Sequence, residues 1–153
     1  MICIDTKEEL SLYNLEGKWN DYIGVQKEVL RVLREKHFFE RNEVVNKASN
    51  LPIRITSKGI RETLGNGNRF QTLAKKLKIY KVATIRYLPA LICDGIVTEI
   101  DAPNSHDAEG YRYAYISNEI VIDGSVVGVR ISIKKKVDSN HFWIHNIDEY
   151  KKL

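Results

Sequence analysis

Hydrophobic and polar residues alternate along the stretch from Tyr111 to Tyr150. Within it, an Asp123-Gly124 pair separates two alternating runs, which is a strong signal for a β-hairpin with a tight turn. The register set by this turn pairs Ile122 with Ser125, Ile120 with Val127, Ile116 with Ile131, Ala114 with Ile133, Ser117 with Arg130, Tyr115 with Ser132 and Tyr113 with Lys134. The first four pairs form an apolar face and the last three a polar face, because side chains alternate across a sheet.

A third alternating run, His141–Ile147, extends this hairpin into a meander. A turn at Asp138-Ser139 places His145 opposite Ser132, whereas a longer loop places it opposite Lys134. In both cases a histidine shares the polar face with cationic and aromatic side chains. We expect Phe142 and Ile144 on the apolar face, and His141, Trp143 and His145 on the polar face.

The part of the chain before the meander reads mainly as helices. Apolar residues at helical spacing predict a helix over residues 19–36. Thr56 or Ser57 can cap a helix that carries Lys58 and Leu64. The other predicted elements are a short helix over 40–48, a strand over 53–55, helices over 70–78 and 80–93 with a break before Pro89, and a strand over 96–100.

Helices followed by an antiparallel sheet predict an α+β fold. We expect N-terminal helices packed on one face of a four-stranded antiparallel sheet, with the polar face open to solvent or ligand. Residues 1–18 are interpreted as a linker or an added start, 19–50 as a helical region and 51–153 as the core. Residues 19–153 are expected to form one compact domain.

The composition of the chain argues against some classes of protein but does not identify a single function. The 153 residues carry a formal net charge of +4, which suits a polyanionic partner without demanding one. Neither Cys3 nor Cys93 lies in a spacing typical of a zinc site. No apolar run reaches the roughly 18 residues of a membrane span, so we expect no membrane insertion by this domain.

The residue types on the polar face match the needs of RNA cleavage through the 2′-hydroxyl. That reaction needs a base, an acid and cations that stabilise the phosphate, and it requires no metal. Histidine suits the first two tasks, lysine and arginine the third, and aromatic rings can stack on bases. The candidates are His141, His145, Lys134, Arg130, Tyr113, Tyr115 and Trp143, with His106 on the polar loop 101–110.

Simpler interpretations compete with this one. Open sheet faces often carry lysine, arginine and tyrosine for solubility and cross-strand pairing. His141 follows Ser139-Asn140 and reads as a loop residue, so His145 is the stronger catalytic candidate. The chain contains no nucleophile elbow and no Walker motif. Cys93 lies in an apolar helical stretch, where a thiol is usually buried and inert.

Three motifs carry a resemblance to a known group: ITSKGIRETL, KVATIRYLPALICDG and the YAYI–IDG–FWIHNID meander. They make residues 51–150 resemble the barnase–EndoU–colicin–RelE-like nuclease domains of phage polyvalent proteins and polymorphic bacterial toxins. The resemblance implies the fold expected above and metal-independent RNA cleavage, often of tRNA, without a cofactor. It also implies a toxin secreted as part of a larger protein, acting in the cytoplasm of a target bacterium and neutralised by a cognate immunity protein.

The resemblance also suggests roles for individual residues. We expect His145 to act as general acid or base, with His106 as its complement. Lys58, Lys134 and Arg86 would bind the phosphate or stabilise the transition state, and Thr84, which shares a motif with Arg86, is a further catalytic candidate. The residues expected to bind RNA are Tyr113, Tyr115, Arg130, Trp143 and Arg61.

Two rival classes remain. A phage-associated module that binds nucleic acid or a protein without cutting would share the basic face and tolerate loss of either histidine. An immunity or antitoxin protein fits less well, because inhibitors of nucleases tend to be acidic and this chain has an isoelectric point near 9.0.

Overall fold

The computed structural model describes residues 1–65, 68–102 and 110–153. They form a mixed α/β fold around a seven-stranded sheet in the order β1-β5-β6-β7-β3-β2, with β4 also paired to β5. The strands are β1 Cys3–Ile4, β2 Glu43–Val45, β3 Pro52–Arg54, β4 Ile96–Ala102, β5 Tyr111–Ile122, β6 Ser125–Lys136 and β7 Phe142–Lys152. The helices are α1 Thr6–Leu10, α2 Tyr22–Glu35, η1 Phe38–Glu40, α3 Ser57–Thr63, α4 Asn68–Gln71, α5 Lys75–Thr84, η2 Ile85–Tyr87 and α6 Leu88–Asp94.

The sheet is larger and less uniform than the four antiparallel strands expected from the sequence. Two of its pairings are parallel, β1 with β5 and β3 with β7, and each joins only two residues of either strand. Pairings this short leave no alternating run long enough to recognise in a sequence. The prediction of a four-stranded, purely antiparallel sheet was therefore wrong.

The β5–β6 hairpin confirms the predicted register at every pair, from Ile122 opposite Ser125 to Tyr113 opposite Lys134. Both turn residues adopt positive φ, 50° at Asp123 and 82° at Gly124. That is the geometry of a type I′ turn, whose twist matches that of the flanking strands. The sequence could predict this register because the two-residue turn alone determines which residues of β5 and β6 pair.

Strand β7 departs from regular pairing with β6 at two points. Asn146 lies opposite Ser132 while Ile144 lies opposite Ile133, so His145 is an extra residue in the ladder. Farther along, Glu149 pairs with Arg130 and Ile147 with Ile131, so Asp148 is a second extra residue. Such β-bulges turn side chains out of the regular alternation. The expectation that His145 would face Ser132 or Lys134 was wrong for this reason.

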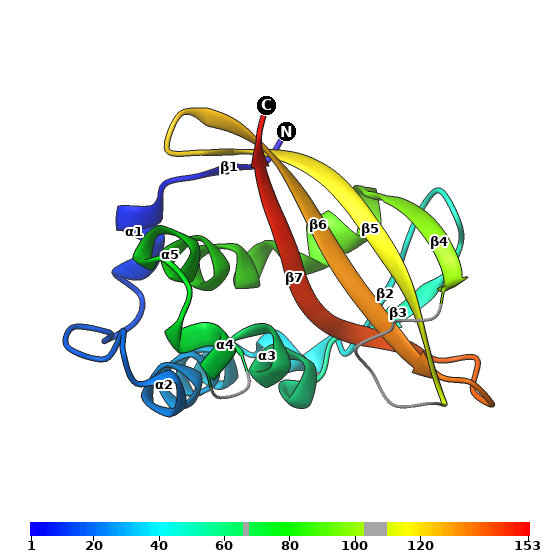
Figure 1. The fold of residues 1–153 in the computed structure, drawn as a ribbon, viewed down its shortest axis with the longest axis horizontal. Helices are drawn as coiled ribbons and strands as arrows, with labels where there is room; N and C mark the ends of the chain where they lie inside the picture. Colours follow the sequence, from blue (N-terminus) through cyan, green and yellow to red (C-terminus); the bar gives the residue numbers. More distant parts are fainter. Residues whose placement is uncertain (66–67, 103–109) are drawn as a thin grey trace.

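The helices gather mainly on one side of the long strands β5, β6 and β7 (Figure 1). Helix α2 begins at an Asp21 cap that accepts a hydrogen bond from the Gly24 backbone at 3.1 Å. It buries Val25, Val29 and Leu33 in the core shared with the sheet. In the described part of the chain, no helix is both long and apolar enough to cross a membrane.

The helix predicted over residues 40–48 is absent. Residues 43–45 form strand β2, which pairs antiparallel with β3. Val44 is half-buried and Val45 is 45% exposed, so the two valines alternate as in a strand. β-Branched residues favour this conformation, which outweighed the helical spacing read from the sequence. The predicted break before Pro89 is confirmed, because η2 separates α5 from α6.

Helix α3 approaches strand β7 unusually closely at Gly59. A Cβ atom built at this glycine would collide with the backbone oxygen and the side chain of Ile144. Thr56 caps the helix and accepts a hydrogen bond from the Gly59 backbone at 3.0 Å, as predicted. The small residue therefore allows the helix to lie directly on the strand, next to the first bulge.

Replacing Gly59 by alanine should destabilise the fold, because the added methyl group would push α3 away from the backbone of β7. We expect Gly59→Ala to lower the free energy of unfolding by about 1–3 kcal/mol, as measured by urea denaturation. Gly128→Ala is the matched control, since its Cβ would meet no atom closer than 3.6 Å. Equal stability of the two variants would contradict the close approach.

Candidate active site

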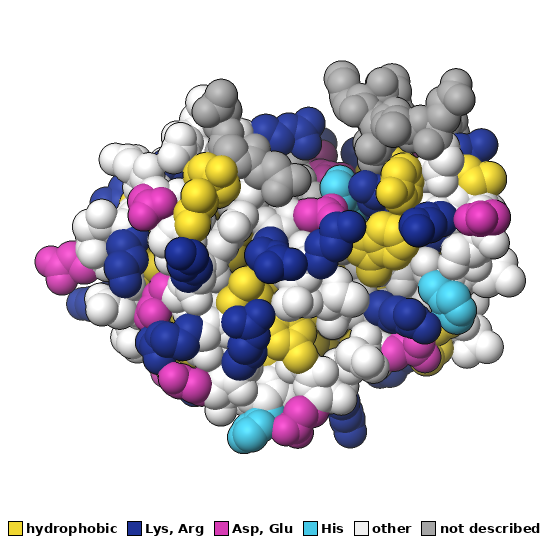
Figure 2. Space-filling view, turned by 90° about the horizontal axis from the view of Figure 1, so that it is seen from below, with side chains coloured by type: hydrophobic (Ala, Val, Ile, Leu, Met, Phe, Trp, Pro, Cys, Tyr) yellow, Lys and Arg dark blue, Asp and Glu magenta, His cyan; other side chains and the backbone are white. Residues whose placement is uncertain are grey.

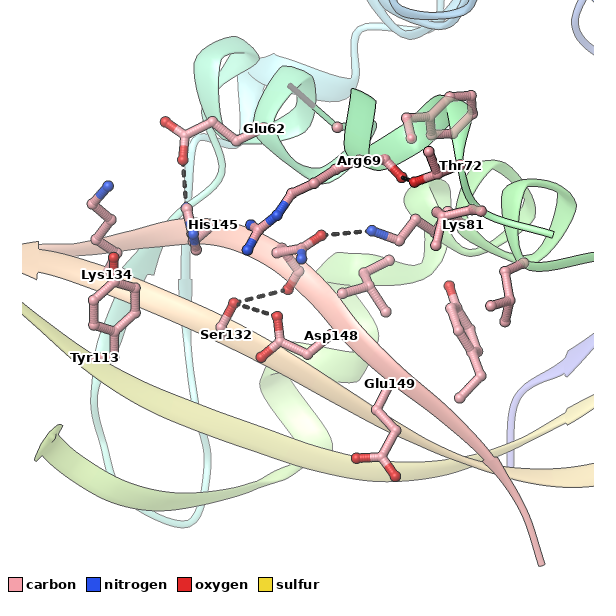
Figure 3. A pocket seen from close by; sticks show the side chains of 17 residues that line it. Glu62, Arg69, Thr72, Lys81, Tyr113, Ser132, Lys134, His145, Asp148 and Glu149 are labelled. Atoms are coloured by element: carbon pink, nitrogen blue, oxygen red, sulfur yellow. Dashed lines mark hydrogen bonds and ion pairs between the residues drawn. The ribbon is translucent and has the colours of Figure 1, made fainter. Parts of the chain in front are cut away.

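A pocket of about 890 Å³ lies beside β7, between the sheet and helices α3, α4 and α5. Beyond its short pairing with β3, β7 has no further partner on that side among the described strands. Both bulge residues, His145 and Asp148, line the pocket. Figure 3 shows charged and polar side chains from the helices and from the sheet pointing into the same space.

Glu62 and His145 form the central contact of this pocket. The Glu62 Oε2 atom lies 2.5 Å from the His145 Nδ1 atom, and the two side chains are 12% and 22% exposed. Glu62 comes from α3 and His145 from β7, so the close approach of helix and strand at Gly59 brings them together.

Glu62 is held in its ionised form. Burial favours the neutral carboxyl group, but the hydrogen bond with His145 and the positive charges of Lys134 and Lys58 outweigh it, so the pKa of Glu62 lies below its ordinary value. An ionised carboxylate only accepts hydrogen bonds, so the Nδ1 atom of His145 is the donor. The Nε2 atom is then the ring nitrogen left for proton exchange with a ligand.

Cationic side chains surround this pair. Lys134 and Arg69 both line the pocket, and in Figure 3 the Arg69 guanidinium group points toward β7 beside His145. Lys134 Nζ lies 4.2 Å from the centre of the Tyr111 ring and 6.0 Å from that of Tyr113. Figure 2 shows many lysine and arginine side chains, interspersed with hydrophobic ones, on the face seen from below the view of Figure 1.

Lys81 lies deeper in the pocket wall, on α5. Its Nζ atom donates hydrogen bonds to the Thr63 backbone oxygen at 3.1 Å and to Asn146 Oδ1 at 2.8 Å. Burial lowers the pKa of Lys81 to about 8, with Asp148 opposing the shift and Arg69 adding to it. Near neutral pH this lysine can therefore gain or lose its charge far more readily than an ordinary one.

Asp148, at the second bulge, accepts a hydrogen bond from Ser132 Oγ at 3.0 Å. Although part of the residue is exposed to solvent, the protein around the carboxyl group removes enough hydration to raise its pKa. The hydrogen bond from Ser132 and nearby positive charges reduce this rise without reversing it. The pocket thus contains two carboxyl groups with opposite pKa shifts, Glu62 and Asp148, as is common where acid–base chemistry occurs.

Several predicted site residues meet in this pocket. His145, Lys134 and Tyr113 line it, with the centres of the Tyr113 and His145 rings 5.5 Å apart. Trp143 packs edge-on against Tyr111 at 6.3 Å. Lys58 is exposed on α3, and its charge still reaches Glu62.

Other predicted residues lie elsewhere. Arg86 forms a salt bridge through two nitrogens with the buried Glu9 carboxylate, at 2.6 and 2.8 Å. Thr84 is fully buried, donates to the Tyr80 backbone oxygen and accepts from the Tyr150 hydroxyl. Neither lines the pocket, so the structure does not bring Arg86 and Thr84 together with His145.

The remaining predicted site residues lie outside the first pocket or outside the described residues. Arg130 stacks on the Tyr115 ring at 3.8 Å and lines a second pocket of about 760 Å³ on the sheet. Arg61 is exposed on α3 and does not line the first pocket. His141 is an exposed loop residue before β7, as expected. His106 lies outside the described residues.

Several residues that line the pocket were not predicted from the sequence as functional. Glu62 was placed in a helix, but nothing local indicated that the helix would meet a histidine 83 positions away. Lys81 was predicted only as part of the helix over residues 80–93. Arg69, Ser132 and Asp148 were not proposed as functional. Among the residues that the structure describes, no three His, Cys, Asp or Glu side chains gather in a metal-binding arrangement.

Comparison with known proteins establishes the family. The model of the large polyvalent protein-associated domain 3 matches residues 21–145, which is most of the chain. The protein belongs to this family of phage polyvalent-protein domains. No curated protein and no solved structure matches it.

This family assignment corrects the resemblance seen in the sequence. The matching model is not that of a barnase–EndoU–colicin–RelE-like nuclease family. The motifs behind the resemblance have structural explanations instead: Gly59 is the close contact of α3 with β7, and Arg86 holds Glu9. The pocket itself is therefore the feature from which a function can be inferred.

The buried position of Lys81 predicts an unusual titration. The Lys81 side chain should titrate with a midpoint near pH 8 in NMR measurements of its Cε resonance. Above that pH the folded protein has released a proton that the unfolded chain still holds. The free energy of unfolding should therefore rise with pH between 8 and 10.5, relative to Lys81→Met. A Lys81 midpoint at 10.5 would contradict this assignment.

Proposed function

We propose that this domain is a metal-independent ribonuclease that cleaves RNA by attack of the 2′-hydroxyl on the adjacent phosphate. The observation that carries the proposal is the Glu62–His145 pair in a pocket lined by Lys134 and Arg69. These are the groups that the reaction needs: an oriented imidazole for proton transfer and cations for the phosphate.

In this mechanism His145 is the catalytic residue and Glu62 positions it. The Glu62 carboxylate holds the Nδ1 proton of the imidazole and stabilises the cation that forms when Nε2 accepts a proton from the 2′-hydroxyl. Lys134 and Arg69 offset the charge that develops on the phosphate oxygens. Protonated His145 can then return its proton to the leaving 5′-oxygen.

The surroundings of the pocket, not its volume, favour an RNA substrate over a small metabolite. About 890 Å³ lies near the upper end of the range for small-molecule sites, which is roughly 300–1,000 Å³. The chain carries a formal net charge of +4, and aromatic rings lie beside the pocket; single-stranded nucleic acids are bound by such a combination of positive charge and stacking rings. Of the expected partners, RNA is the one that these features support.

The toxin, tRNA and immunity-protein expectations came from the corrected resemblance. Secretion within a larger protein, action in the cytoplasm of a target bacterium, tRNA as substrate and neutralisation by an immunity protein stay predictions. None of them is needed for the chemistry proposed for the pocket, and a ribonuclease acting on other RNA would use the same residues.

A binding module without cleavage activity is the second candidate. It is favoured by one observation: the Glu62–His145 contact also joins α3 to β7 and can serve as a structural clamp. In that case the basic pocket would hold nucleic acid or an acidic protein segment, and His145 would have no role in proton transfer.

Substitution of His145 should separate the two functions. With RNA as substrate in the presence of EDTA, we expect His145→Ala to cleave roughly 10²–10⁴-fold more slowly than the parent. Glu62→Gln should lose less activity, because the imidazole keeps a hydrogen-bonding neighbour but loses the carboxylate that orients it. Both are measured by initial rates across a range of pH.

His37 offers a matched control. Its Nδ1 atom lies 2.7 Å from Glu40 Oε1, which repeats the histidine–glutamate contact at a fully exposed position outside the pocket. His37→Ala should therefore keep the activity of the parent. An unchanged rate in His145→Ala, or a parent protein that binds RNA without cleaving it, would favour the binding module instead.

A further inference from the structure

The hydroxyl group of Tyr113 is buried and has no hydrogen-bond partner among the described residues. A buried polar group without a partner loses its hydration and receives nothing in return, which destabilises the folded state. Such groups are rare in native proteins, and each one calls for an explanation, such as a catalytic role or a bound water or ion. The Tyr113 residue as a whole is only 1% exposed.

The position of this hydroxyl links it to the candidate active site. Tyr113 lies on β5 directly opposite Lys134 on β6, and both side chains line the pocket. The Tyr113 ring centre is 5.5 Å from that of His145 and 6.0 Å from Lys134 Nζ. In Figure 3 the hydroxyl points toward the Lys134 side chain, beside His145.

We propose that the Tyr113 hydroxyl and the Lys134 ammonium group together form a phosphate-binding subsite next to His145. The hydroxyl donates a hydrogen bond to a phosphate oxygen, and the ammonium group neutralises the charge. A bound phosphate would thus supply the partner that the hydroxyl lacks. The inference rests on the proposed ribonuclease function, because it takes this phosphate to be the one beside the scissile bond.

The chemistry of the subsite favours a phosphate over other ligands. Its groups are a neutral donor and a cation, and Arg69 adds a second positive charge along the same pocket. An anion with several oxygens can accept hydrogen bonds from all three at once. A free phosphate ion and the phosphate of a nucleic acid share this chemistry, so the test must include both.

Tyr113→Phe removes the hydroxyl and leaves the ring. Without ligand, its thermal midpoint should be higher than that of the parent, because the unpartnered hydroxyl is gone. With a ligand, the effect should reverse: inorganic phosphate and a 2′-deoxy oligonucleotide should each bind roughly 10- to 100-fold more weakly, the usual value of a hydrogen bond to a charged group. Thermal shifts and NMR titrations measure both quantities.

Tyr13 is the matched control. Its hydroxyl is also buried without a partner among the described residues, and the residue is 6% exposed. Tyr13 lies beside Glu9 and Arg86 and does not line the pocket. Tyr13→Phe should therefore raise the thermal midpoint in the same way while leaving the affinity for phosphate and oligonucleotide unchanged.

Three results would overturn the subsite. In the first, Tyr113→Phe binds phosphate and the oligonucleotide as tightly as the parent. In the second, it has a lower thermal midpoint than the parent without ligand, which means that the hydroxyl already has a partner within the chain. Weaker binding of the oligonucleotide together with unchanged binding of free phosphate would also contradict it, since both ligands share the same group.

The subsite and the ribonuclease can fail separately. If the parent never cleaves RNA but Tyr113→Phe loses phosphate affinity, the subsite stands and the ribonuclease function falls. If the parent cleaves RNA and Tyr113→Phe cleaves it at the same rate with the same affinity, the ribonuclease stands and the subsite falls.

Discussion

The contact between helix α3 and strand β7 is the constraint on which the candidate site depends. Gly59 lets the helix lie against the backbone of Ile144, one residue before the first bulge of β7. That bulge removes His145 from the regular ladder, and Glu62 meets it from the next turn of the helix. Without the small residue or without the bulge, the carboxylate and the imidazole would not face each other.

Much of the fold follows from local signals in the sequence, and the rest depends on distant pairing. The Asp123-Gly124 turn determines the β5–β6 register, and Thr56 starts α3, so both were predictable. Strand β1 is held by a parallel pairing of two residues and by Thr6, which binds Asp123 through its hydroxyl at 2.7 Å. No pattern within residues 1–18 encodes a partner so far along the chain.

The site was only partly predictable, for a related reason. The alternation of side chains along the strands identified Tyr113 and Lys134 as a cross-strand pair and placed His145 on the adjacent strand. This succeeded because β5, β6 and β7 are neighbours in the sheet. Bulges are not visible in such alternation, so the displacement of His145 and the role of Asp148 were missed. Glu62 and Lys81 line the pocket only because their helices, α3 and α5, pack beside the sheet. Arg86 shows the opposite case. It lies in a motif that suggested a catalytic role, yet its side chain pairs with the buried Glu9 carboxylate outside the pocket.

If the Glu62–His145 pair promotes attack by a 2′-hydroxyl, the chemical ends of the cleavage products will reveal it. A short RNA with a single 2′-deoxy position, incubated with the domain in EDTA, can be analysed by mass spectrometry. We expect fragments ending in a 2′,3′-cyclic phosphate and a 5′-hydroxyl, with no cleavage after the 2′-deoxy nucleotide. Products with a 5′-phosphate, or cleavage at the 2′-deoxy position, would contradict it.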